Sequence, residues 1–98
     1  MKSLGLVEVS GVTAGIDCLD IMCKSANVEF VTWERKLGGR LVTIIVQGDV
    51  SAVTAAVENA VAHAITKPAA YAVIASPHEE TKRMVDLSAA RIQKKAGN

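Results

Sequence analysis

The stretch "NVEFVTWERKLGGRLVTIIVQ" (residues 27–47) predicts a β-hairpin. Val, Phe, Thr and Trp favour a strand over residues 27–35, and the β-branched run over 41–47 favours a second strand. Between them, Gly38 and Gly39 supply the positive φ angles that a type I′ turn needs, because glycine has no Cβ to clash. An antiparallel pair of strands is therefore the starting point of the fold.

Upstream of the hairpin, the sequence predicts one strand and one helix. The short apolar run over 4–9 is closed by "SG" and is typical of a strand that ends at a turn. From Val12 to Ala26 the polar residues recur at i, i+4, i+7 and i+11, which predicts a helix with one thin polar stripe. The stripe consists of Thr13, Asp17, Asp20 and Lys24.

Downstream of the hairpin, a second helix is expected from Val50 to Ile65, followed by a strand over 71–75. Asp49 stands at the N-cap position, where its carboxylate can accept hydrogen bonds from free backbone amides of the first turn. Pro68 ends the helical region because proline moves the preceding residue out of helical geometry.

A charged segment after Pro77 is expected to form a last helix from Glu79 that frays at its end. The preceding order is strand, helix, strand, strand, helix, strand. That order predicts an α+β fold of the ferredoxin-like, split βαβ type, with a four-stranded antiparallel sheet and both helices on one face.

Composition limits the possible functions. The chain has 98 residues, 50% of them hydrophobic, which suits one compact domain. Its net charge of +1 provides no strong field for nucleic acid or an anionic membrane, and aromatic residues, at 3%, are too few for base stacking. No apolar stretch reaches the roughly 20 residues of a spanning helix, and the N-terminus does not resemble a secretory signal. We therefore expect a cytosolic protein with no nucleic-acid or membrane partner.

Few residues are candidates for chemistry. His63 and His78 are potential acid-base groups, but no Ser or Cys is placed by sequence as a nucleophile beside them. Cys18 and Cys23 fit neither a CxxC motif nor a zinc site, so both are expected to be buried free thiols. The glycine pair matches no nucleotide-binding loop. We expect no catalytic site, metal or cofactor.

The two amphipathic helices have more apolar surface than a small sheet can cover. In a monomer this surface would remain exposed, so self-association is expected. A closed cyclic assembly would bring one loop from every subunit to a shared axis, and the hairpin tip is a candidate for that loop.

Three segments within residues 3–78 point to a known family: "LGLVEVSGVTAGIDCLDIMCKSANV", "KLGGRLVTIIVQGDVSAVTAAV" and "VIASPH", in that order. Together they resemble the single-domain, hexamer-forming shell proteins of bacterial microcompartments. The resemblance implies a shell domain over 1–78, with 79–98 as a C-terminal helix or tail of the same domain. It also implies a structural role without catalysis, in which flat hexamers tile into a sheet that encloses metabolic enzymes.

The resemblance assigns a disc edge to two segments. In "KSANV", Lys24 and Asn27 would lie at the contact between hexamers, where lysines of adjacent discs face each other. The family's "RPH" appears here as "SPH", so Pro77 and His78 are kept while Ser76 replaces an arginine. One hydroxyl replaces five donors, and weaker tiling or a different edge contact is expected.

The resemblance also assigns a pore on the six-fold axis to Lys36, Leu37, Gly38, Gly39 and Arg40. Gly39 stands where a serine often faces the channel, so the opening should be wider or lined by backbone amides. Arg40 replaces a glycine and would place six positive charges at the mouth, favouring anions. The alternative is that Arg40 folds back onto an acidic neighbour such as Glu34, or into solvent.

The implied partners are five further copies of the chain, other shell proteins and enclosed enzymes. A second interpretation is an oligomeric, ferredoxin-like module that senses a small molecule. It does not account for the "KSAN" and "GDV" matches.

Overall fold

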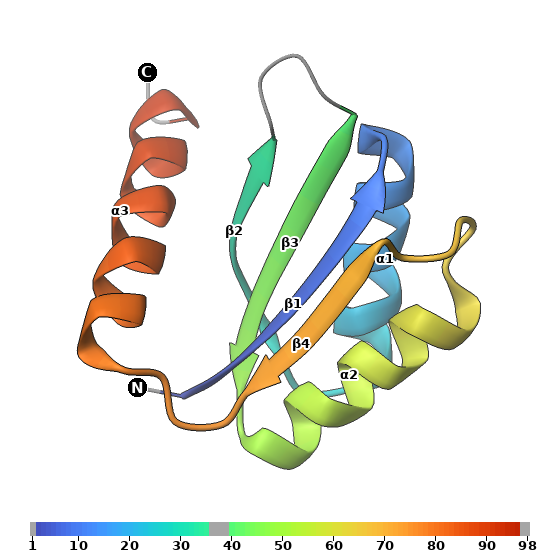
Figure 1. Cartoon of the computed structure of the whole chain (residues 1–98), viewed down its shortest axis with the longest axis horizontal. Coiled ribbons are helices and arrows are strands. Elements are labelled where there is room, and N and C mark those ends of the chain that lie inside the picture. The colour runs from blue at the N-terminus through green and yellow to red at the C-terminus, as the bar shows by residue number, and fades with distance from the viewer. Residues whose placement is uncertain (1, 36–39, 97–98) are drawn as a thin grey trace.

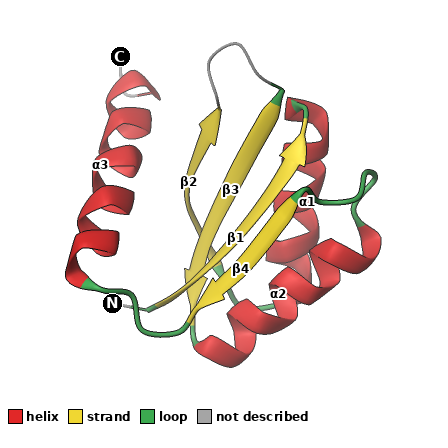
Figure 2. Cartoon of the chain, in the orientation of Figure 1, coloured by secondary structure: helices red, strands yellow, loops and turns green. Residues whose placement is uncertain are grey.

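The fold is a four-stranded sheet with three helices, seen in a computed structural model that describes residues 2–35 and 40–96 (Figure 2). The elements in chain order are β1 (Ser3–Ser10), α1 (Val12–Ser25), β2 (Glu29–Arg35), β3 (Leu41–Gly48), α2 (Val50–His63), β4 (Ala70–Ile74) and α3 (Glu79–Ala96).

The strands lie in the order β2-β3-β1-β4, and all three neighbouring pairs are antiparallel. This arrangement confirms the predicted α+β, split βαβ fold with a C-terminal helix. The element boundaries differ slightly from the prediction. The strand expected from 27 begins at Glu29, and the helix expected to reach Ile65 ends at His63.

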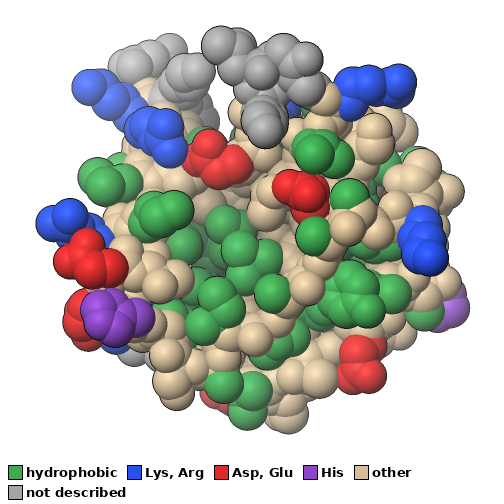
Figure 3. Space-filling model, in the orientation of Figure 1, with side chains coloured by type: hydrophobic (Ala, Val, Ile, Leu, Met, Phe, Trp, Pro, Cys, Tyr) green, Lys and Arg blue, Asp and Glu red, His purple; other side chains and the backbone are tan. Residues whose placement is uncertain are grey.

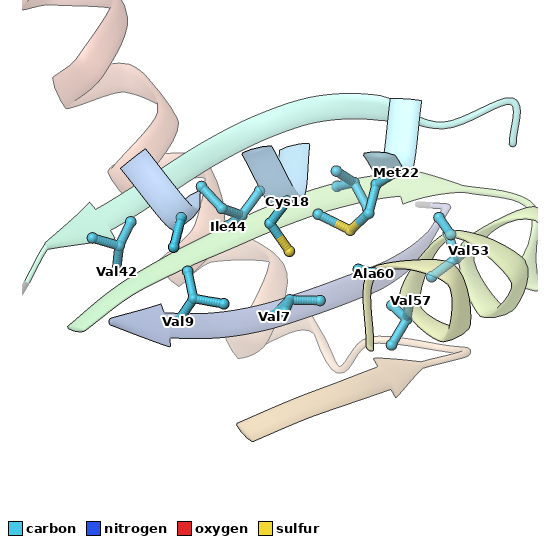
Figure 4. Close-up of a cluster of buried hydrophobic side chains, with 12 residues drawn as sticks. Val7, Val9, Cys18, Met22, Val42, Ile44, Val53, Val57 and Ala60 are labelled. Carbon is cyan, nitrogen blue, oxygen red and sulfur yellow. The ribbon is translucent and has the colours of Figure 1, made fainter. Parts of the chain in front are cut away.

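Helices α1 and α2 cover one face of the sheet, as predicted, and enclose the main core. In Figure 4, Cys18 and Met22 of α1 lie over the sheet, with Val53 and Val57 of α2 beside them. Every second residue of β1 and β3 points into this core, because side chains alternate across a strand. These core strand residues are Val7, Val9, Val42, Ile44 and Val46.

Helix α3 lies on the other face of the sheet, along β2, and only at one side (Figure 1). Val85 packs there with Leu4 and Ile45 in a second, smaller apolar cluster. The hydroxyls of Thr32 and Ser88 hydrogen-bond at 2.7 Å, and both residues are buried. A short apolar cluster and a small group of polar contacts to β2, made by Ser88 and Arg91, therefore hold α3 to the sheet.

Among the described residues, no helix packs on the rest of this second face, over β1 and β4. A shallow groove of about 220 Å³ lies there, lined by Leu6, Glu8, Thr43, Ala70, Tyr71 and Ala72. Figure 3 shows apolar side chains gathered at the centre of this face. Met84 of α3 is 73% exposed. Exposed apolar side chains also occur on the first face: Val12 and Ile16 on α1, and Tyr71 at the sheet edge, where it pairs with the core residue Val7. The single chain thus exposes apolar surface on both faces, including the helix surface that the sequence predicts.

Candidate functional site

Lys24 lies in the last turn of α1 and extends into solvent. Its Nζ is 2.8 Å from Oδ2 of Asp20, one helical turn earlier, and the two side chains are 76% and 57% exposed. The hydrogen bond to Asp20, followed by the charge of that carboxylate, raises the pKa of Lys24. Lys24 is therefore a fixed positive charge at the end of the helix.

The segment after Lys24 is held against the end of β3. Helix α1 stops at Ser25, Ala26 is extended, and the exposed Asn27 leads into β2. A Cβ added to Gly48 would lie 3.1 Å from the carbonyl oxygen of Asn27. Gly48 thus lets the chain pass closely beside β3, which fixes where Asn27 lies.

Ser76, Pro77 and His78 connect β4 to α3. Pro77 is buried, whereas Ser76 and His78 are exposed. The Ser3 hydroxyl donates to the carbonyl of Ala75 at 2.7 Å, which ties this connection to the start of β1. His78 Nδ1 accepts the backbone N–H of Glu80 at 3.0 Å and so caps the start of α3.

The two predicted edge segments lie at the same end of the sheet. The register pairs Leu4 with both Gln47 and Ile74, and Glu29 with Gln47. Residues 24–27 precede β2 at this end, and 76–78 follow β4 at the same end, on the opposite outer strand. Strand β2 ends and β3 begins at the other end of the sheet (Figure 1).

Most of the predicted pore residues, Lys36 to Gly39, lie outside the described residues, so the type I′ turn and the pore lining stay predictions. Arg40 is described and exposed. Its carbonyl accepts the N–H of Gly11 at 2.6 Å, which anchors the base of the turn to the start of α1. Gly11 has a φ of 98°, a conformation that favours glycine.

Arg40 does not fold back onto Glu34 within the described part of the chain. Oε2 of Glu34 instead accepts the Ser88 hydroxyl and lies 2.9 Å from Nη2 of Arg91, both on α3. Sequence reasoning missed this pairing because α3 is more than fifty residues away along the chain. Glu34 thus has its partners on α3, and the exposed Arg40 fits the other half of the alternative, in which its side chain extends into solvent.

Two further expectations need correction. Cys18 is buried, and burial raises its pKa to about 11, but Cys23 is exposed because it faces away from the sheet. Asp49 does occupy the N-cap position of α2, yet its carboxylate makes no capping hydrogen bond; its backbone carbonyl accepts the N–H of Val53 at 2.9 Å instead.

His63 is the last residue of α2 and His78 follows β4; both are exposed. Within residues 2–35 and 40–96, no group of three or more His, Cys, Asp or Glu side chains is placed to hold a metal ion. In the same ranges, no helix has the length and apolar character needed to cross a membrane.

The partner of Lys24 was also missed, although its signal is present in the sequence. Asp20 and Lys24 are four residues apart in the polar stripe of the first helix, and this spacing brings side chains together on a helix surface.

Comparisons with known proteins agree on one family. The family model described as "BMC domain" matches residues 3–77. Bacterial microcompartment shell protein PduA of Citrobacter freundii is 44% identical over 86 residues, which are 86% of this chain and 91% of the relative. PduA of Salmonella typhimurium is also 44% identical over 86 residues, which are 86% of this chain and 90% of the relative. A solved microcompartment protein from Desulfitobacterium hafniense superposes with a TM-score of 0.75 at 26% identity; the match covers 90% of this chain and 48% of that one.

Proposed function

Because the chain belongs to the BMC domain family of bacterial microcompartment shell proteins, we propose that it forms cyclic homohexamers that tile edge to edge into the shell. Its place is then the shell of a microcompartment in the cytoplasm. The relatives are structural shell proteins, and we propose no catalytic step for this chain.

The observation that carries this proposal is the separation of the two predicted contact regions. Exposed Lys24 and Asn27 lie at one end of the sheet with Ser76 and His78, whereas Arg35 and Arg40 lie at the other end. In a ring of subunits, Arg40 would then lie near the central axis and residues 24–27 and 76–78 at the outer rim. The rim residues would be free to contact neighbouring rings.

The exposed apolar surface supports association between copies. The groove over β1 and β4, which Leu6 and Ala72 help to line, leaves this face of the sheet incompletely covered in one chain. Contiguous apolar surface of this kind is typical of interaction sites. We propose that neighbouring subunits of the hexamer cover it.

The pore of the proposed hexamer would be formed by Lys36 to Arg40. A unit positive charge about 8 Å from an anion on the axis contributes roughly 0.5 kcal/mol in bulk water, so six Arg40 side chains contribute about 3 kcal/mol before salt screening. The exposed Arg40, with Glu34 already bound to α3, supports a pore that favours small polar or anionic metabolites.

We propose that residues 1–78 form the shell domain and that 79–98 belong to the same domain. The family match ends at residue 77, before α3 begins. Val85 and Ser88 nevertheless pack against the sheet, which supports one common unit. Other shell proteins and enclosed enzymes are the proposed further partners. The family match does not favour the alternative of a small-molecule sensor.

Native mass spectrometry and electron microscopy test the proposal directly. We expect six-fold discs that assemble into sheets, and a stable monomer at micromolar concentration would refute it. Replacing Lys24 with Asp should prevent sheets while leaving hexamers intact. The matched control is Lys67→Asp, an exposed lysine in the connection between α2 and β4, which should leave both assemblies unchanged.

A further inference from the structure

The ion pair between Asp20 and Lys24 forms a small charge pattern on the surface of α1. The two groups are one helical turn apart, 2.8 Å from each other, and both are largely exposed. Asp17, one turn earlier, is different because its Oδ2 already accepts the backbone N–H of Ile65 at 3.1 Å. Asp20 has no such backbone contact among the described residues, so its second oxygen is available to another partner.

A two-fold contact places the same surface patch of two molecules against each other. A patch with one lysine alone would then bring two ammonium groups together. A patch with an acid and a base one turn apart is self-complementary, because the rotation sets the acid of one copy opposite the base of the other.

We propose that Asp20 and Lys24 of two adjacent hexamers form a four-charge cluster in which each Asp20 also accepts a hydrogen bond from the Lys24 of the other hexamer. This inference rests on the proposed tiling at the Lys24 edge. It assigns to Asp20 the role of a positioning residue: it holds the lysine in place and cancels its charge, so that like charges do not separate the discs.

The local electrostatics agree with this role. The hydrogen bond to Asp20 raises the pKa of Lys24, so the lysine stays protonated well above neutral pH. Lysine offers three donors, and the pair within one chain uses one of them. Two donors on each lysine remain for the second molecule.

The salt dependence of Asp20→Asn tests the cluster. The substitution keeps the shape of the side chain but leaves two uncompensated lysines facing each other. At low salt, the concentration needed for sheets should rise about fivefold, the scale that exposed charge pairs allow. Added salt should restore assembly of Asp20→Asn by screening repulsion, whereas it should weaken wild-type sheets. Native mass spectrometry should show that Asp20→Asn still forms hexamers. Glu58→Gln, an exposed carboxylate on α2, is the matched control.

The double exchange Asp20→Lys with Lys24→Asp tests complementarity itself. It restores the self-complementary pattern with opposite polarity, so sheets lost in Lys24→Asp should return. Failure of the exchange to assemble, together with Asp20→Asn sheets that match wild type at every salt concentration, would overturn the cluster while the proposed tile stands. Wild-type hexamers that never form sheets would remove the tiling proposal, and this inference with it. If the exchange does not form hexamers, the salt response of Asp20→Asn decides alone.

Discussion

Gly5 is the residue whose size matters most for the packing of α2 on the sheet. A Cβ at this position would lie 2.8 Å from Cγ1 of Val53 and 3.0 Å from Cγ2 of Val57, both in the core. Contacts this short require the helix or the two valines to shift. We expect Gly5→Ala to lower the free energy of unfolding by about 1–3 kcal/mol, measured by urea denaturation at fixed protein concentration.

Gly15 provides the comparison. Its added Cβ would lie 3.1 Å from Cγ1 of Val42, a milder approach to the end of a side chain. Because Gly15 is inside α1, alanine also gains about 0.5–1 kcal/mol from helix formation. Gly15→Ala should therefore change stability by less than about 1 kcal/mol. If Gly5→Ala and Gly15→Ala lowered the free energy of unfolding equally, the close contacts of Gly5 with Val53 and Val57 would not explain the lower stability of Gly5→Ala.

Arg40 determines the proposed charge preference of the pore. At physiological salt the pore axis would lie about one Debye length from each arginine. Screening therefore reduces the preference for anions that the six arginines create to a few-fold. Arg40→Ser should lower the flux of a small anion relative to a neutral solute about fivefold through assembled shells. Arg83→Ser, an exposed cation of α3, is the control for loss of a cation elsewhere. An unchanged flux ratio would remove the electrostatic role of Arg40.

Among the elements, α3 is held most weakly. Ser88 is its main polar anchor, since its hydroxyl contacts both the buried Thr32 and Glu34. In Ser88→Ala, Thr32 would keep only a long contact of 3.4 Å to the carbonyl of Trp33. A buried hydroxyl left in this state costs about 1–3 kcal/mol.

We expect Ser88→Ala to increase hydrogen exchange of the α3 amides while exchange in β1 and β3 stays slow. Ser51→Ala, an exposed serine of α2, is the control and should leave α3 protected. Rapid exchange throughout the sheet in Ser88→Ala would instead mean that α3 is part of the central folding unit.

The periodicity of the sequence predicted the elements well but not the burial of α3. The strands and the first two helices have regular alternation or a thin polar stripe, so their buried faces follow from spacing alone. In α3 the large apolar residues Met84, Val85, Leu87 and Ile92 recur at mixed helical spacing, and only Val85 of these is buried. The face that α3 uses is set by Thr32 and Glu34 on β2, more than fifty residues away, and local patterns do not contain that information.

At the scale of the whole molecule, the positions of the edge and the turn follow from antiparallel topology. The hairpin joins β2 to β3 at one end, so the segment that enters β2 must lie at the other end. This relation could be deduced from the order of elements. The pairing of Asp20 with Lys24 could be deduced from their spacing as well. The proposed contacts between subunits would involve other copies of the chain, and for these the family resemblance was needed.

Ser76 offers the last test of the assembly. It is exposed directly after β4, at the end of the sheet where residues 24–27 lie, and the related shell proteins are expected to have arginine there. Five guanidinium donors in place of one hydroxyl should add hydrogen bonds between discs. Ser76→Arg should thus lower the concentration at which hexamers form sheets, by roughly tenfold if about 1.4 kcal/mol is gained per contact.

Light scattering and electron microscopy of purified hexamers provide the measurement. Thr66→Arg, in the exposed connection at the opposite end, adds the same charge away from the edge and should have no effect. If Ser76→Arg assembles no better than this control, the edge of this protein does not include residue 76, and contacts around Asp20, Lys24 and Asn27 must hold the discs together.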